Sequence, residues 1–81
     1  MEYSAGQITG AAVSALMKSL DVDEHWLAKK LGVKVPYVYG IKKGKPMSLE
    51  QCKKVANLFG CKLSQFIDIG EKSLERAKEK N

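Results

Sequence analysis

Glycines and prolines divide this chain into short segments in which apolar residues recur at helical spacing. The first such segment, over about residues 7–20, places an apolar residue at every fourth position. Its repeating residues are Ile8, Ala12, Leu16 and Leu20. No segment alternates between apolar and polar residues over a useful length, so strands are not expected. We interpret the seven scattered glycines as helix stops and predict an all-α fold.

The two helices that follow are predicted from their termini. Asp23 is placed to cap a helix over residues 24–31, and Gly32 is the expected stop. The next helix spans residues 35–43, with Pro36 in its first turn, where no amide hydrogen is needed. Both helices are short, and only the tight turn Gly32-Val33-Lys34 separates them.

A fourth helix is predicted from Ser48 to Phe59. The segment Ser48-Leu-Glu-Gln51 has the form of a capping box, in which a serine and a glutamine satisfy each other's backbone amides. Gly60 follows as the stop. The apolar residues expected on the core side of this helix are Leu49, Cys52, Val55, Ala56 and Phe59.

The fifth predicted helix is short and ends at Gly70. Residues 71–81 hold only Leu74 and Ala77 as apolar residues, so we expect a charged C-terminal tail or a marginal helix there. The chain then divides into a domain over residues 1–70 and a tail over 71–81. With 81 residues, of which 44% are apolar, the chain allows one compact domain of five helices.

The residue types exclude several classes of protein. Cys52 and Cys61 provide no disulfide framework, and their spacing with His25 matches no zinc pattern, so no metal is expected. No paired acids, nucleophile with a base, or phosphate-binding glycine loop is present, so we expect neither an enzyme nor a cofactor. No apolar leader and no run near the roughly 20 apolar residues of a membrane span occur, which favours the cytoplasm.

Positive charge is concentrated in the middle of the chain. The formal net charge is +5, and no acid occurs between Glu24 and Glu50. That interval holds the lysines Lys29, Lys30, Lys34, Lys42, Lys43 and Lys45. Such a cluster suits a polyanion such as nucleic acid, and it equally suits a solvated lysine surface.

The short helix, tight turn and short helix over residues 24–43 predict a helix-turn-helix. The wider pattern is Leu27-Ala28-x-x-Leu31-Gly32-Val33, Gly44, Ser48-Leu49 and Val55-Ala56-x-x-Phe59-Gly60-Cys61-x-Leu63. Over roughly residues 8–69 this pattern resembles the lambda-repressor-like (Cro/C1, XRE) helix-turn-helix family. The resemblance is specific for the fold, because the spacings of small and apolar residues agree across four helices.

The resemblance implies a DNA-binding transcriptional regulator of phage or bacterial type. In such domains the third helix enters the major groove and the second lies across the backbone of double-stranded DNA. A wheel of the third helix turns Val38 and Ile41 inward. The base-facing candidates on its outer side are Val35, Pro36, Tyr39 and Lys43. The phosphate-contacting candidates are Lys34, Lys42 and Lys45.

Two departures from the family favour a second hypothesis. Of the base-facing candidates only Tyr39 and Lys43 can hydrogen-bond to bases. Asp21, Asp23 and Glu24 also place three carboxylates where phosphate should approach. The alternative is therefore a helix-turn-helix scaffold that acts through protein contacts, as an antitoxin, anti-activator or co-regulator. Exposed aromatic side chains at Tyr39 and Trp26 would suit such an interface, and Trp26 would equally suit the edge of the core.

The family usually acts as a symmetric dimer, which makes a homodimer the expected assembly. Phe66, Ile67 and Ile69 on the fifth helix are partly surplus to so small a core. We expect a dimer contact at these residues, with ordinary core packing as the alternative, above all for Phe66.

Overall fold

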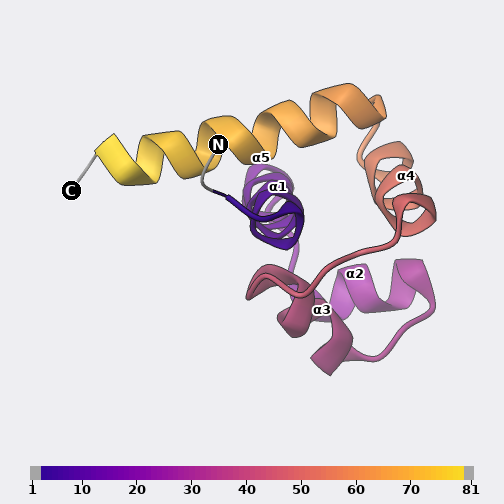
Figure 1. The fold of residues 1–81 in the computed structure, drawn as a ribbon. Coiled ribbons are helices and arrows are strands. Elements are labelled where there is room, and N and C mark those ends of the chain that lie inside the picture. Colours follow the sequence, from indigo (N-terminus) through magenta and orange to yellow (C-terminus); the bar gives the residue numbers. More distant parts are fainter. Residues whose placement is uncertain (1–2, 80–81) are drawn as a thin grey trace.

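The computed structural model describes residues 3–79, and over this range the chain forms five α-helices and no strand (Figure 1). The predicted compact all-α fold of five helices is confirmed. The helices are α1 (Ala5–Leu20), α2 (Glu24–Leu31), α3 (Val35–Lys42), α4 (Leu49–Leu58) and α5 (Leu63–Glu79).

Side-chain caps start three of the helices. Asp23 caps α2 and Ser48 caps α4, as predicted, each accepting a hydrogen bond from the backbone amide three residues later. For α4 the donor is Gln51, at 3.1 Å. The reciprocal capping box lies instead at the start of α1, where Ser4 and Gln7 each accept from the other's backbone amide at 2.8 and 3.1 Å.

The turn between α2 and α3 depends on a left-handed residue. Gly32 has φ 71° and ψ 33°, a conformation that a side chain disfavours. The amide of Val33 then donates to the carbonyl of Ala28 at 3.0 Å, which closes α2. Gly32 therefore ends α2, as predicted, and the turn that it forms leads into α3.

All five helices contribute side chains to one core. Its largest fully buried residues are Phe66, Leu27, Ile41, Val13, Val38 and Val55. The one buried polar side chain of the described chain, Thr9, donates back to the carbonyls of Ala5 and Gly6. The prediction that Leu49 faces the core is wrong, because this residue is 67% exposed. It occupies the first turn of α4, before the helix reaches the core.

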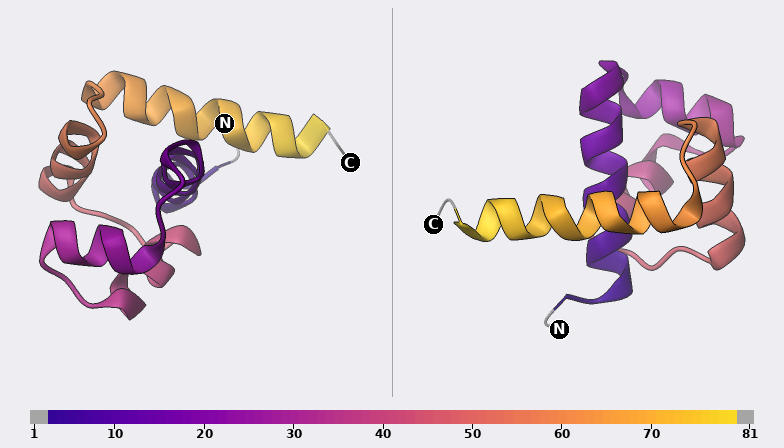
Figure 2. Two further views of the ribbon diagram at one scale, coloured as in Figure 1. Left: turned by 180° about the vertical axis from the view of Figure 1, so that it is seen from behind. Right: turned by 90° about the horizontal axis from the view of Figure 1, so that it is seen from above.

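The predicted end of the fifth helix at Gly70 is also wrong. α5 continues from Leu63 to Glu79, so the expected domain boundary at residue 70 lies inside a helix. Gly70 is buried, and a Cβ there would lie 2.1 Å from the carbonyl oxygen of Ile8. Beyond this crossing, α5 extends past α1 and away from α2–α4 (Figure 2). Residues 80 and 81 of the predicted tail lie outside the described residues.

Two further glycines, Gly6 and Gly10, lie on the face of α1 opposite to Ile8. A Cβ on Gly6 would lie 2.1 Å from the carbonyl oxygen of Gly44, and one on Gly10 would lie 2.4 Å from that of Ile41. At about 100° per residue, Ile8 points away from both glycines. α1 therefore lies between α5 on one side and α3 with its following loop on the other. These glycines are not helix stops, as the sequence had suggested, but sites of close backbone approach.

Substituting the contact glycines is expected to destabilise the domain. Gly10→Ala and Gly70→Ala must each displace a backbone carbonyl, which should cost roughly 1–3 kcal/mol in free energy of unfolding. Gly40→Ala is the matched control, since its Cβ would meet only the flexible Lys45 side chain at 3.5 Å. This control should gain roughly 0.5–1 kcal/mol from helix propensity. Urea unfolding of the three variants checks the order, and equal stabilities would contradict the close approach.

Candidate nucleic-acid interface

The helix-turn-helix is formed by α2 and α3, with α3 packed through one face against the body of the domain. Val38 and Ile41 on that face are 0% and 1% exposed, as predicted. The carbonyl of Ile41 sits against Gly10 of α1. Since the back of α3 is fixed by this packing, its opposite face is the one available to a partner (Figure 1).

The available face of α3 carries most of the predicted base-facing residues. Tyr39 is 45% exposed, and Pro36 and Lys43 are also exposed. Pro36 lies in the first turn, as expected from its missing amide hydrogen. Val35 differs from the other three, because it is only partly exposed and packs against the core. The face thus offers one hydroxyl and one ammonium group that can hydrogen-bond.

Exposed lysines lie at both ends of α3. Lys34 is the residue before the first turn, and Lys45 follows the last turn. The Lys45 ammonium lies 5.7 Å from the centre of the Tyr37 ring, a cation–π distance. Both lysines lie between Glu24 and Glu50, where the sequence has no acidic residue, so no adjacent carboxylate offsets their charge.

Lys42 is in a different state, because it forms an ion pair with Glu24 of α2. The Lys42 side chain is 29% exposed and the Glu24 side chain 16%. The Lys42 ammonium donates a hydrogen bond to Glu24 and also lies 5.9 Å from the centre of the Tyr39 ring. The hydrogen bond from Lys42 is the main reason that the pKa of Glu24 is lowered from its ordinary value of 4.5. This pair was not foreseen from the sequence.

Two of the acids at the start of α2 accept hydrogen bonds from groups within the protein. Glu24 is held by Lys42, and the Asp23 carboxylate accepts from the Trp26 amide at 2.9 Å. Asp21 is exposed at the end of α1, where it adopts the left-handed conformation with φ 56°. Of the three carboxylates expected to repel phosphate, only Glu24 has its charge offset by a lysine, whereas Asp21 and Asp23 are exposed.

Trp26 covers the edge of the core, which is one of the two roles that its sequence position allowed. Its ring centre lies 5.9 Å from that of Phe59, and the Lys30 ammonium lies 5.8 Å from the Trp26 ring centre. It is half-buried between them. Tyr39 is therefore the large exposed aromatic of the helix-turn-helix.

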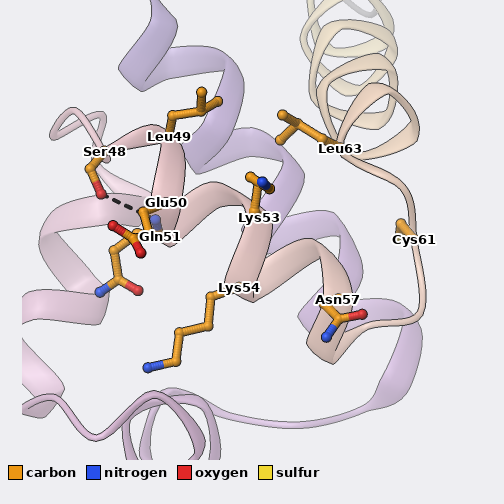
Figure 3. A pocket seen from close by; sticks show the side chains of 9 residues that line it. All are labelled: Ser48, Leu49, Glu50, Gln51, Lys53, Lys54, Asn57, Cys61 and Leu63. Atoms are coloured by element: carbon orange, nitrogen blue, oxygen red, sulfur yellow. Dashed lines mark hydrogen bonds between the residues drawn. The ribbon is translucent and has the colours of Figure 1, made fainter.

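The outer side of α4 and the start of α5 border an open hollow (Figure 3). It is lined by Ser48, Leu49, Glu50, Gln51, Lys53, Lys54, Asn57, Cys61 and Leu63.

Within the described part of the chain, no three His, Cys, Asp or Glu side chains gather as a possible metal site. Across residues 3–79, none of the helices combines the length and apolar content that a membrane crossing requires.

The three residues expected at a dimer contact are separated by the fold. Phe66 is 0% exposed and belongs to the core, which was the alternative considered for it. Ile67 and Ile69 pack against the core but remain partly exposed. Of the three residues expected at a dimer contact, Ile67 and Ile69 are the ones with exposed side-chain surface for a contact between copies.

Comparison with known proteins agrees with this architecture. The family model described as Helix-turn-helix matches residues 26–66, just over half of the chain. The matched segment contains α3 and α4 complete, and it lies inside the span over which the sequence resembles the Cro/C1-type family. No curated protein and no solved structure matches the chain.

The Glu24–Lys42 pair should give a pH-dependent contribution to stability. Because the pKa of Glu24 is lowered on folding, its contribution is present above pH 4.5 and is lost as pH falls through the folded value. Glu24→Gln removes this group, so wild type should be more stable than the variant at pH 7. The gap between them should shrink below pH 4.5. Urea unfolding of both proteins across this range checks it, and a gap independent of pH would contradict it.

Proposed function

Because the chain belongs to the Cro/C1-type (XRE) helix-turn-helix family, we propose that it is a DNA-binding transcriptional regulator of phage or bacterial type. Proteins of this family are typically DNA-binding regulators without enzymatic activity. In this proposal α3 enters the major groove of double-stranded DNA, and α2 crosses the backbone. Such a regulator acts inside the cell, in keeping with the expected cytoplasmic location.

The observation that carries the proposal is the free face of α3 between two exposed lysines. Tyr39 and Lys43 lie on this face, and Lys34 and Lys45 lie at its ends. A helix whose back is buried and whose front is exposed and cationic fits the major groove, which admits an α-helix. In this role Lys34 and Lys45 contact phosphates and set the orientation of α3.

The chemistry available for reading bases is limited to a few contacts. The Tyr39 hydroxyl can donate to or accept from a base edge, and the Lys43 ammonium can donate to guanine O6 and N7. Pro36 and the exposed part of Val35 can contact a thymine methyl group. A single copy of the chain would therefore discriminate only a few base pairs.

Selection of bound sites from random duplex DNA, followed by salt-titrated mobility shifts, tests the proposal. The expected result is an enriched motif, bound more tightly than random DNA and with an affinity that falls as salt rises. Absence of retardation for every duplex at low salt would reject DNA binding.

Two substitutions should separate base reading from phosphate contact. Tyr39→Ala should reduce the preference for the selected site over random DNA by roughly tenfold, since a base contact contributes about 1–3 kcal/mol. Lys45→Gln should weaken binding to all sequences alike and reduce the salt slope by about one. Lys72→Gln, on the distant part of α5, is the charge-matched control. Equal effects of Lys45→Gln and Lys72→Gln would contradict a local phosphate contact.

The proposed regulator binds as a symmetric homodimer through α5. Support comes from the partial exposure of Ile67 and Ile69, which are large apolar side chains on a helix that extends beyond the domain (Figure 2). Two copies related by a two-fold axis would place their α3 helices on half-sites about 34 Å apart.

Replacing the more C-terminal of these residues should weaken the dimer. Ile69→Glu places a charge in the contact, so wild type should sediment as a dimer at high micromolar concentration and the variant as a monomer. Ser64→Glu, which introduces the same charge at an exposed position of α5, is the control. Sedimentation of wild type as a monomer at these concentrations would reject the dimer.

Action through protein contacts is the second candidate function, as an antitoxin, anti-activator or co-regulator. The observation that favours it is the sparse set of base-reading groups on α3, which leaves the exposed Tyr39 as a possible interface anchor. If site selection enriches no motif while Tyr39→Ala abolishes capture of a cognate protein, this second candidate holds and the first does not.

A further inference from the structure

The Glu24–Lys42 ion pair joins the two helices of the helix-turn-helix at the edge of the available face. Glu24 begins α2 and Lys42 ends α3, and they are 18 positions apart in the sequence. The Lys42 ammonium also lies 5.9 Å from the centre of the Tyr39 ring. The pair thus adjoins Tyr39, the exposed aromatic side chain of this face.

The side chains of Lys42 and Glu24 are more sheltered from water than those of the Lys72–Asp68 pair on α5. Their side chains are 29% and 16% exposed, whereas those of Lys72 and Asp68 on α5 are 66% and 55% exposed. Shelter from water weakens the screening of the attraction between opposite charges. The Lys42 ammonium keeps further donors besides the one given to Glu24, but its positive charge is already offset by this carboxylate, so it attracts a phosphate oxygen less strongly than a free lysine would.

We propose that Glu24 is an internal competitor for DNA phosphate, whose carboxylate holds Lys42 and keeps this lysine out of the phosphate contacts. The inference rests on the proposed DNA-binding function and concerns how the same surface is regulated. A carboxylate and a phosphate both offer anionic oxygens to an ammonium group, so one can occupy the place of the other. Lys42, expected from the sequence to contact phosphate, is then silent in the wild-type protein.

Removing the carboxylate should release Lys42 to the DNA. With Glu24→Gln, one more phosphate is neutralised, so the log-log salt slope should steepen by about 0.9. The affinity for random duplex DNA near 0.1 M salt should rise roughly five- to tenfold. Asp68→Asn is the matched control, because it also removes one acid from an ion pair with lysine, but on α5. Its slope should equal that of wild type.

A double variant distinguishes release of Lys42 from simple loss of a repelling charge. Glu24→Gln with Lys42→Gln has the same net charge as wild type and lacks the pair. If Lys42 is silent in wild type, the double variant should keep the wild-type slope and lose the gain of Glu24→Gln. Glu24→Ala with and without Lys42→Gln repeats the comparison with a strong helix former in place of glutamine. Circular dichroism of each variant verifies that the helices are retained.

Three results would overturn the inference while leaving DNA binding intact. These are a Glu24→Gln slope equal to that of Asp68→Asn, a double variant that keeps the gain, and a double variant whose slope is shallower than wild type by about 0.9. In the last case Lys42 already contacts phosphate in the wild-type complex. Absence of binding by wild type and every variant at low salt would instead reject the proposed function itself.

Discussion

The close approach of backbones around α1 is the contact on which the rest of the domain depends. Gly70 lets α5 reach the carbonyl of Ile8, and Gly10 lets α1 reach the carbonyl of Ile41 on its other face. No side chain separates the elements at these points, so their spacing is set by backbone atoms that cannot change rotamer. α1 therefore fixes α3 and α5 relative to each other, although few direct contacts between those two helices are needed.

The exposed face of α3 is a consequence of this arrangement. Val38 and Ile41 are buried because α1 and α2 cover them, which leaves Tyr39 and Lys43 on the far side of a short helix. Only residues 32–34 separate α2 from α3, and the burial of Val38 and Ile41 fixes which face of α3 turns outward. Packing behind α3 thus decides which side chains a partner can meet.

Features that depend on neighbours a few positions apart were predictable from the sequence. The caps Asp23 and Ser48, the stop at Gly32 and the inward Val38 all follow from local rules of helix geometry. Gly70 was not, because a glycine that ends a helix and one that admits another backbone have the same local signature. Only the position of Ile8 in the folded chain distinguishes the two roles.

The same limit applies to the candidate site. The spacing of Leu49 fits the apolar side of α4, yet its place in the first turn leaves it in solvent. The sequence placed Glu24 among acids that repel phosphate and Lys42 among lysines that attract it. Their pairing across 18 positions is a tertiary contact that the sequence does not reveal, and it sets the two charges against each other. Charge counted along a chain therefore overstates what a folded surface offers.

A sparse reading face has a consequence for assembly. If one copy reads only a few base pairs through Tyr39 and Lys43, a specific site needs the base contacts of two copies, whose free energies combine when both half-sites are bound. That combination requires a fixed distance between the two α3 helices. In the proposed dimer the distance is set by α5 on one side and α3 on the other, which are joined through α1. In that proposed dimer, the glycines that hold α1 would support base recognition as well as stability, because a shift at Gly70 or Gly10 would move α3 relative to the two-fold axis.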